Sequence, residues 1–417
     1  MTARSNDILL VHPGKQHAYE VAVALQEHGR LLRFVTGIYD APSSWLISVT
    51  HVVSRVCMRD QIERQLSKRR HPAIEPRLVV SWPAAELVSR TVGHVRLVQR
   101  LTRGRSGYLL ANWCHDRAVA RALRAGRWQP RAVYGFLGAA RYTFAACREL
   151  GIRTILDVPI VLSASYTMAK ERRMLGITRG QPTISTLHLS TELRNADQVI
   201  APSPAVAESV RASGYSGPIS EVAFGAALDC FRPSAVRRER FRVVYAGRIE
   251  LRKGLHYLVR GWNDAAVQGE LVIAGSPGEA EYVDRVRAEY GDSIMEAGNL
   301  TRDELAQLLG TADVFVMPSL AEGSALVTYE ALAAGLPSIV THESGSVVRD
   351  GIEGFVVPAG DSAALATCIR ELHGNPVLRA RMSTAARARA EEFSWPAYRR
   401  RLIAAIDSGV VSEYATA

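Results

Sequence analysis

The sequence predicts an α/β protein built from two doubly wound domains in tandem. Short apolar runs rich in β-branched residues alternate with amphipathic helical patterns, and the alternation occurs as two separate sets. Parallel strands that are buried on both faces give such runs, and the intervening helices cover the sheet. A chain of 417 residues is long enough for two hydrophobic cores.

The first set of predicted elements lies in the N-terminal half. A strand over Asp7–His12 is followed by a helix over Ala18–His28, which Gly29 closes. The further strands predicted here are Leu31–Thr36, Arg77–Ser81, Val133–Leu137, Arg153–Val158 and Gln198–Ala201.

The second set repeats the pattern after a segment with little periodicity, Phe224–Arg237. Its predicted strands are Arg242–Gly247, Glu270–Ala274, Ser293–Glu296, Val314–Pro318, Ser338–Thr341 and Phe355–Val357. We therefore predict an N-terminal domain over 1–225 and a C-terminal domain over 226–397. A final helix over about 398–417 is expected to pack back on the N-terminal domain. Ligands of such folds bind at the carboxyl ends of the strands.

Charge is distributed unevenly between the two halves. Residues 1–235 hold 31 Lys and Arg against 17 Asp and Glu, a balance of +14, and the remaining residues hold 20 against 24, a balance of −4. The basic residues are densest over 55–105, and the wider segment 45–105 also carries apolar stretches. Such a charge suits an anionic membrane surface, a phosphorylated acceptor or nucleic acid, or it is an ordinary solvated Arg-rich surface.

The composition indicates a cytoplasmic protein. Any contact with a membrane is expected to be peripheral. No apolar run reaches the roughly 18 residues of a membrane span, and Ile8–Val11 is too short for the core of a signal peptide. The five cysteines are scattered and form no C-x-x-C pair, which argues against a disulfide framework and a zinc site.

Several common chemistries have no motif in this chain. There is no complete phosphate-binding P-loop, no G-x-S-x-G and no H-E-x-x-H. No two aspartates are two positions apart, so the D-x-D pair that holds a metal against a diphosphate is missing. We expect no metal and no cofactor. A diphosphate would have to be bound by cationic side chains and helix ends.

The first candidate site segment is Gly247–Gly254, which follows the strand that begins the second set. The glycine at 247 lets the chain turn, and Arg248 and Lys253 then place two cations at the carboxyl end of the strand. Two cations directed at a leaving phosphate stabilise the charge that develops as a glycosidic bond breaks. Alone, this spacing also fits a surface turn with ordinary ion pairs.

The second segment is Pro318–Glu330, in which Gly323 and Ser324 are expected to open a helix. The helix start offers backbone N–H groups to a diphosphate. Glu322 lies just before it and can accept hydrogen bonds from sugar hydroxyls. Glu330 lies about 9 Å further along the helix axis, where a carboxylate suits the 2′,3′-diol of a ribose.

Two further strand-to-helix turns are candidates for contact with a nucleobase. They are Ile273–Pro277, which includes Gly275, and Gly298–Leu300, which includes Asn299. Each turn by itself is also an ordinary connection in this class of fold.

These segments together resemble the retaining glycosyltransferases of the GT-B fold, family 4. The resemblance covers the whole C-terminal half through Y-A-G-R-I-E-L-R-K-G, L-V-I-A-G, A-D-V-F-V-M-P-S, the E-x7-E pair Glu322/Glu330, A-L-A-A-G-L-P and D-G-I-E-G-F-V-V-P. The N-terminal half matches more loosely, in its first strand with the glycine loop at Gly14, in A-D-Q-V-I-A-P-S and in D-C-F-R-P.

The resemblance implies a site and a reaction. Arg248, Lys253 and Glu322 would carry the chemistry, with the cations on the diphosphate and Glu322 on the transferred sugar. Glu330 would bind the ribose, the segment Gly323, Ser324, Ala325, Leu326 and Val327 the phosphates, and Asn299 and Leu300 the base. Gly247 and Gly275 would border the donor, and Gly14 would approach it from the N-terminal, acceptor-binding domain.

The implied reaction is metal-independent hexosyl transfer with retention, an EC 2.4 activity. A nucleotide diphosphate sugar, with a UDP-sugar favoured, would be the donor. The acceptor would attack on the face of the leaving group, and the departing phosphate would take its proton. The acceptor would be a glycan, a lipid-linked intermediate or a small molecule; nucleic acid is not an expected partner.

The chain departs from the family pattern at three places near the sugar. Many relatives carry a histidine after a mid-domain strand, but here Asp157 follows Ile155-Leu156. The usual Phe-Gly after Glu322-Gly323 is Ser324-Ala325. The first loop carries His12 and His17, which, with Asp157, are tentative contacts to the acceptor or the sugar.

Two rival interpretations stay open at this stage. One is a GT-B protein of another activity, such as a sugar-nucleotide epimerase. The other is a non-catalytic basic protein that binds membranes or polyanions and has kept only the fold. A transferase should bind a nucleotide sugar and lose that binding on Arg248→Ala, whereas a charge-driven binder should not.

Overall fold

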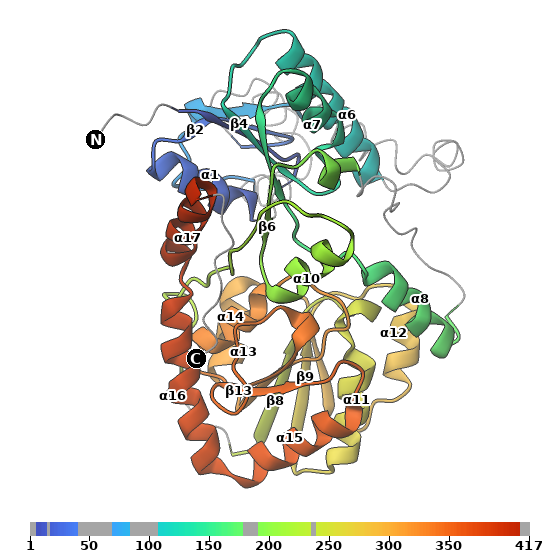
Figure 1. Ribbon diagram of the computed structural model, residues 1–417. Coiled ribbons are helices and arrows are strands. Elements are labelled where there is room, and N and C mark those ends of the chain that lie inside the picture. The colour runs from blue at the N-terminus through green and yellow to red at the C-terminus, as the bar shows by residue number, and fades with distance from the viewer. Residues whose placement is uncertain are drawn as a thin grey trace, which may run out of the picture.

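A computed structural model of the chain describes residues 6–14, 17–40, 69–83, 107–177, 191–234 and 239–408. It contains two parallel β-sheets, each with helices on its faces, and Figure 1 shows one lobe above the other. The predicted fold class, two doubly wound α/β domains, is confirmed.

The first sheet is entirely parallel, and among the described residues it has seven strands. Their spatial order is β3 (Val79–Ser81), β2 (Leu31–Thr36), β1 (Ile8–Val11), β4 (Ala132–Phe136), β5 (Arg153–Asp157), β6 (Gln198–Ala201) and β7 (Ile219–Glu221). Burial on both faces explains the uninterrupted apolar runs: Ile8 and Leu10 pack into one core, while Leu9 and Val11 pack into a second.

Helices cover the first sheet. Those described are α1 (Ala18–Glu27), the short η1 (Pro76–Leu78), α6 (Gly107–Arg124), α7 (Arg141–Glu149) and α10 (Pro204–Ala212). Helix α8 (Ala164–Met174) follows β5 but packs against η2 (Leu251–Lys253) of the second domain, where Arg172 also pairs with Glu279 at 2.6 Å. The start of α10 follows from local chemistry, since the Ser203 hydroxyl accepts from the Val206 amide at 3.4 Å and Pro204 occupies the first helical position.

The second sheet is also parallel, with six strands in the order β10 (Ile294–Gly298), β9 (Gly269–Ala274), β8 (Phe241–Ala246), β11 (Val314–Met317), β12 (Ser338–Thr341) and β13 (Gly354–Val357) over residues 239–408. Its helical segments are η2 (Leu251–Lys253), α11 (Leu255–Ala265), α12 (Ala280–Arg287), α13 (Arg302–Gly310), α14 (Leu326–Ala333), η3 (His342–Ser344), α15 (Ser362–Gly374) and α16 (Pro376–Glu392).

Each sheet has a point where the strand order reverses. In the first sheet β1 pairs with both β2 and β4, and in the second β8 pairs with both β9 and β11. Helices on either side of such a point diverge, so a crevice forms outside the carboxyl ends of the strands. The topology therefore places one expected crevice beyond β1 and β4 and another beyond β8 and β11.

The chain returns to the first domain at its end. Helix α17 (Trp395–Ser408) packs on α1, and Arg399 pairs with Glu20 at 3.1 Å and Glu27 at 2.6 Å (Figure 1). Helix α17 begins at Trp395, three residues before the predicted start. Residues 409–417 lie outside the described part. Where the two chain segments that connect the domains run side by side, a Cβ on Gly225 would lie 2.6 Å from the backbone of Ser394, so only glycine fits.

Every strand predicted from the sequence is present, and β7 is the strand that was missed. It has only three residues, and a run that short carries no periodic signal. Along the sequence, the last strand of the first sheet ends at Glu221 and the first strand of the second sheet begins at Phe241. The predicted domain boundary at 225/226 lies between them.

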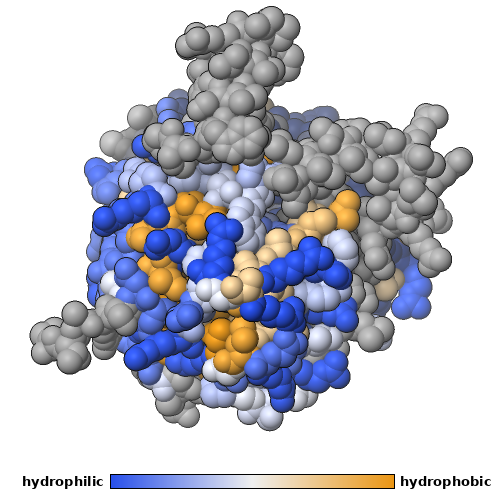
Figure 2. Space-filling model, turned by 90° about the horizontal axis from the view of Figure 1, so that it is seen from above, coloured by the Kyte–Doolittle hydropathy of each residue, from blue (hydrophilic) through white to orange (hydrophobic). Residues whose placement is uncertain are grey.

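Most of the predicted docking segment over 45–105 lies outside the described residues, and its role stays a prediction. Seen from above the N-terminal domain, hydrophilic side chains cover much of the described surface, with small hydrophobic areas between them (Figure 2). In the part of the chain that the structure describes, no helix is both long and apolar enough to cross a membrane.

Candidate active site

A pocket of about 460 Å³ lies at the carboxyl ends of the strands at the centre of the second sheet. It forms where the topology places a crevice, beyond β8 and β11. The predicted donor residues that line it are Gly247, Arg248, Lys253, Gly275, Asn299, Leu300, Glu322, Ser324, Ala325, Leu326, Val327 and Glu330. Gly323 and the candidates of the N-terminal domain are not among its lining residues.

Glycines let the loops after three strands approach one another at this pocket. A Cβ on Gly275 would lie 2.0 Å from the carbonyl oxygen of Gly247, and the φ of Gly275 is +150°. A Cβ on Gly254 would lie 2.0 Å from the carbonyl oxygen of Pro318, again at positive φ. Larger residues would force the loops after β8, β9 and β11 apart, so these glycines set the shape of the pocket.

Glu322 is joined to two cations. The Lys253 ammonium donates to Glu322 Oε2 at 2.7 Å, and Arg252 Nη1 lies 2.5 Å from the same oxygen. Burial acts to raise the pKa of Glu322, but the charges of Lys253 and Arg252 outweigh it and hold the pKa below its ordinary value. Glu322 is therefore an ionised hydrogen-bond acceptor at neutral pH.

Arg252 is a functional candidate that the sequence reasoning missed. Its guanidinium bridges Glu250, at 2.8 Å, and Glu322, while its carbonyl oxygen accepts from the amides of Leu320 and Ala321. The short turn η2 thus supports the loop that carries Glu322. The residue was visible beside Lys253, but nothing in the sequence indicated that its partner lies 70 positions away.

Replacing Arg252 with glutamine is expected to lower sugar transfer by between about tenfold and a hundredfold, the usual cost of one charge-assisted hydrogen bond. Because Arg252 also lowers the pKa of Glu322, the acid limb of the kcat profile should move to higher pH. A pH–rate profile of Arg252→Gln, Arg252→Lys and the surface variant Arg260→Gln tests this. An unmoved acid limb in Arg252→Gln would show that Glu322 does not depend on Arg252.

The helix that borders the pocket begins two residues later than predicted. Helix α14 starts at Leu326, because Ser324 and Ala325 are held in the preceding loop. The Ser324 hydroxyl donates to the Gly345 carbonyl at 2.8 Å, and the Ala325 amide donates to the Ser344 carbonyl at 3.0 Å. The amides of the first helical turn, at Leu326 and Val327, are those that a helix leaves without intrahelical partners.

Glu330 lines the pocket from α14, and its carboxylate makes no hydrogen bond within the described chain. Burial raises the pKa of Glu330 to about 7, although the charge of Arg302 acts in the opposite direction. A largely buried carboxylate without a partner is costly, which is typical of a group that a ligand completes.

The predicted N-terminal candidates lie in the other domain. His17 Nε2 is 2.8 Å from Asp157 Oδ2, and the Tyr134 hydroxyl donates to the same oxygen at 2.6 Å. His12 stacks on Phe136, with 4.4 Å between ring centroids. These side chains gather at the carboxyl ends of β1, β4 and β5, the second place where the topology predicts a crevice.

A tight backbone contact joins the two domains between the crevices. A Cβ on Gly323 would lie 1.7 Å from the carbonyl oxygen of Pro159, which follows β5, and the Ser203 hydroxyl donates to the Gly323 carbonyl at 2.6 Å. Glu322 is therefore one residue from the N-terminal domain, and Asp157 is two residues from this contact.

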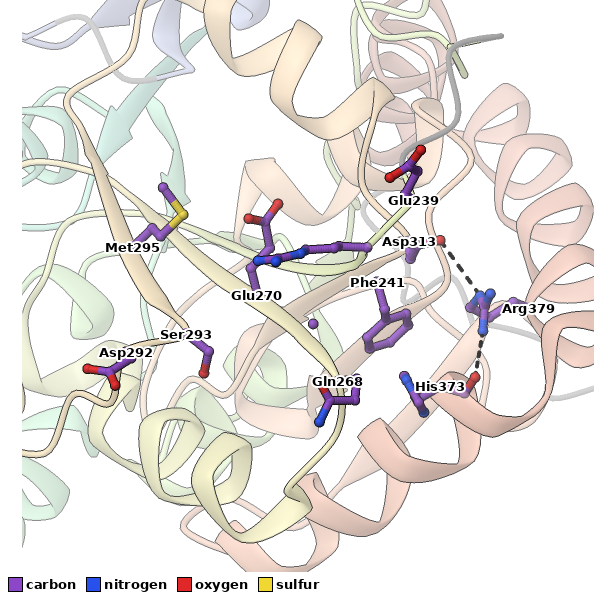
Figure 3. Close-up of a pocket in the computed structure, with 12 residues that line it drawn as sticks. Glu239, Phe241, Gln268, Glu270, Asp292, Ser293, Met295, Asp313, His373 and Arg379 are labelled. Carbon is purple, nitrogen blue, oxygen red and sulfur yellow. Dashed lines mark hydrogen bonds and ion pairs between the residues drawn. The ribbon is translucent and has the colours of Figure 1, made fainter.

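A further pocket, of about 640 Å³, lies at the opposite end of the second sheet (Figure 3). Several of its charged groups have partners: Arg379 lies 3.8 Å from Asp313 and donates to the His373 carbonyl at 3.1 Å, and Arg242 donates to Glu270 at 2.5 Å. It lies at the amino ends of the strands, whereas ligands of such folds bind at the carboxyl ends.

Comparisons with known proteins agree with this architecture. Residues 240–375 match the family model for Glycosyl transferases group 1. A D-inositol 3-phosphate glycosyltransferase of Streptomyces scabiei is 32% identical over 270 residues, which is 57% of this chain and 60% of that protein. The match thus spans less than two thirds of this relative's length.

Two solved structures share the fold over nearly the whole chain. Sucrose-phosphate synthase from Thermosynechococcus elongatus has a TM-score of 0.62 and 19% identity, covering 96% of this chain and 98% of that one. Anabaena HepE in complex with UDP and glucose has a TM-score of 0.61 and 16% identity, covering 96% and 99%.

The two parallel-sheet domains, with a pocket at the carboxyl edge of the second sheet, have the GT-B fold of these solved structures. Within the second domain, residues 240–375 are similar to the group 1 glycosyl transferases, in agreement with the motifs of this half of the chain.

Proposed function

We propose that this protein transfers a sugar from a UDP-sugar to a hydroxyl acceptor, with retention of configuration and without a metal ion. The observation that carries the proposal is the arrangement of charges in the 460 Å³ pocket. Arg248 and the Lys253–Glu322 pair line the same pocket as the unpartnered carboxylate of Glu330, as binding of a sugar, a diphosphate and a ribose requires.

In this scheme each part of the donor has a counterpart. Arg248, Lys253 and the first turn of α14 bind the diphosphate, because two cations and free amides stabilise phosphate charge. Glu322 accepts hydrogen bonds from the transferred sugar. Glu330 accepts from the ribose diol, and Asn299 and Leu300 border the base.

The proposed reaction is the one that the resemblance implies. The acceptor hydroxyl forms the new glycosidic bond on the same face from which the diphosphate departs, and the bond from the anomeric carbon to the phosphate oxygen breaks. The departing phosphate takes the acceptor's proton, so no protein nucleophile is needed. Arg248 and Lys253 stabilise the charge that grows on the phosphate, a task that a metal ion performs in other enzymes.

Two comparisons support the choice of donor and the chemistry of the acceptor. The structural neighbour HepE was solved with UDP and glucose, which supports a uridine diphosphate donor. The relative from Streptomyces scabiei is named for D-inositol 3-phosphate, which supports an acceptor with several hydroxyl groups.

The proposal is tested by thermal unfolding in EDTA with UDP-, GDP-, ADP- and dTDP-sugars. A ligand at 100 times its Kd stabilises a protein by about 2.7 kcal/mol, so binding is readily seen. We expect UDP-sugars to raise the Tm of the wild type but not of Glu330→Ala. If no nucleotide stabilises the wild type, or only one supplied with a metal does, the proposed donor chemistry is wrong.

Donor binding is expected to weaken as pH falls through about 7, the pKa of Glu330. Only the ionised carboxylate accepts from both hydroxyls of a ribose, so below this pH the affinity for a UDP-sugar should fall by up to about tenfold per pH unit. Calorimetric titration of a UDP-sugar between pH 5.5 and 8.5 measures this, because its phosphates do not titrate in that range. Glu330→Gln should bind weakly and independently of pH.

The stability of the unliganded protein should respond in the opposite sense. Because the pKa of Glu330 is raised in the folded state, the folded protein binds more protons than the unfolded chain between about pH 4.5 and 7. The contribution of Glu330 to the free energy of unfolding therefore falls as pH rises through this window. Comparing the Tm of wild type and Glu330→Gln across the same buffers separates this effect from ligand binding.

A further inference from the structure

A carboxylate of the first domain is buried against the second domain. Glu171 lies on α8, which follows β5 of the first sheet and packs against η2. Its exposed fraction is 7%, and its Oε2 accepts from the Tyr257 hydroxyl at 3.0 Å and lies 3.6 Å from His256 Nε2. His256 and Tyr257 both belong to the first turn of α11. We refer to the interaction of these three side chains as the α8–α11 contact.

The second domain holds His256 in place to meet this carboxylate. The His256 ring is buried, and its Nδ1 lies 3.0 Å from the Tyr282 hydroxyl of α12. The Tyr282 oxygen also accepts from the His256 amide at 3.4 Å, so the tyrosine contacts both the ring and the backbone of the histidine. Hydrogen bonding from His256 holds the pKa of Glu171 below its ordinary value, although burial acts to raise it. Glu171 is therefore ionised at neutral pH.

A buried carboxylate in such a place contributes little to the stability of a fold. Taking the charge out of water costs about as much free energy as its interactions contribute, and apolar residues of similar volume often stabilise a core equally well. The best attested use of a buried charged group is to fix the register of packed elements. Because α8 and α11 belong to different domains, the α8–α11 contact fixes how the first domain meets the second.

The α8–α11 contact adjoins the segment that carries the cations of the donor pocket. Lys253 is the last residue of η2, and Gly254 alone separates it from α11. The Tyr257 amide donates to the Gly254 carbonyl at 2.9 Å, which joins the first turn of α11 to this glycine. A shift of that turn would therefore displace the ammonium group of Lys253.

The first domain contacts both loops that supply the Lys253–Glu322 pair. The Gly323 carbonyl, next to Glu322, accepts from a serine of the first domain at 2.6 Å. Helix α8 packs against η2, which carries Lys253. Arg172 of α8 also pairs with Glu279, at the start of α12, at 2.6 Å, and Figure 1 shows these two helices next to each other. The position of each partner in the pair therefore depends on the other domain.

On the basis of the proposed transferase function, we propose that Glu171 is a positioning residue for sugar transfer. It does not line the donor pocket. It holds the first turn of α11, and through this turn η2, where Lys253 reaches the departing phosphate. Because Glu171 belongs to the first domain, the leaving phosphate is fully stabilised only while the two domains are in contact. The donor is thereby protected from cleavage when the domains are apart.

The test compares Glu171→Leu and Glu171→Gln in the full-length chain. Leucine is similar in size and accepts no hydrogen bond, whereas glutamine still accepts from Tyr257 through its amide oxygen but carries no charge. Tyr257→Phe removes the same hydrogen bond from the other side. Glu289→Gln is the matched control, because Glu289 also pairs with a residue of α11, Arg260, at 2.7 Å, but lies within the second domain.

The measurements require no knowledge of the acceptor. Hydrogen–deuterium exchange of the unliganded chain is followed over residues 250–257, where the amides of Lys253 and Gly254 are hydrogen-bonded at 3.0 Å. Hydrolysis of UDP-glucose, UDP-galactose and UDP-N-acetylglucosamine, with water in place of the acceptor, gives kcat and KM for UDP release. Calorimetric titration of UDP and the Tm are measured on the same samples.

We expect faster exchange over residues 250–257 in Glu171→Leu than in the wild type. Its kcat for UDP release should fall by between about tenfold and a hundredfold, because a small misplacement of a catalytic group is enough to cost this much. KM should stay within about threefold of the wild type, since an interaction lost only in the transition state lowers kcat alone. Glu171→Gln and Tyr257→Phe should show smaller changes in the same direction, and Glu289→Gln should behave as the wild type.

Other results would overturn the proposal. If exchange over residues 250–257 in Glu171→Leu matches that of the wild type, Glu171 does not hold η2. Faster exchange with an unchanged kcat, or a lower Tm as the sole effect, would mean that Glu171 serves only the stability of the fold. A wild type that binds no UDP contradicts the proposed function itself, whereas intact UDP binding with any of the preceding results rejects only this inference.

Discussion

Replacing Lys253 with alanine is expected to lower the rate of bond cleavage during sugar transfer by about 10²–10³-fold. The ammonium group lies beside Glu322 and lines the pocket where the diphosphate is proposed to depart. Removing one preorganised group that stabilises developing negative charge typically costs this much. The change also leaves Glu322 with Arg252 as its remaining cation, so the carboxylate proposed to bind the sugar loses part of its support.

Single-turnover measurement of UDP release with a saturating UDP-sugar checks this expectation, because it isolates bond cleavage from product release. Lys170→Ala is a suitable control, since Lys170 is exposed on α8 and away from the pocket. A Lys253→Ala enzyme that retains a rate within about threefold of the wild type would remove Lys253 from the proposed mechanism.

A single methyl group at Gly323 is expected to reduce transfer by about a hundredfold while leaving UDP binding nearly intact. The added Cβ would lie 1.7 Å from the Pro159 carbonyl oxygen and 2.4 Å from its carbon, and backbone atoms cannot rotate away as a side chain can. The loops after β5 and β11 would have to move apart. Misplacement by about 1 Å is enough to cost this much in rate when two reactants must be aligned.

Small-angle scattering, UDP titration and kcat measured on Gly323→Ala distinguish this from general damage. The control is Gly374→Ala, because a Cβ at that position meets nothing within 4 Å. We expect a larger radius of gyration, unchanged UDP affinity and a reduced kcat in Gly323→Ala only. Full activity of this variant would show that contact between the domains at this point is not needed for transfer.

The strands and the donor pocket were accessible from the sequence, and the reason is that both are encoded locally. Each strand is a short apolar run, and the pocket residues lie at the end of a strand, in the loop that follows it or in the first turns of the next helix. Parallel strands bring their carboxyl ends to one edge, so Arg248, Glu322 and Asn299 were placed together by topology alone.

What the sequence did not reveal depends on contacts between distant segments. The Arg252–Glu322 pair joins loops 70 residues apart, and the His17–Asp157 pair joins residues 140 positions apart. Local pattern also misplaced the start of α14, because the carbonyl oxygens of Ser344 and Gly345 hold Ala325 and Ser324 in the loop. Contacts between distant segments therefore determine both ion pairs and the residue at which α14 begins.

Helix α17 has a consequence for how this protein can be divided. Residues 395–408 form one of the surface helices of the N-terminal domain, and in the sequence they follow the whole second sheet. A gene fragment that stops between the sheets would leave α1 uncovered, together with Glu20 and Glu27. The N-terminal domain therefore depends on the C-terminal end of the chain. Co-expressed halves should reassemble only if the C-terminal fragment retains α17.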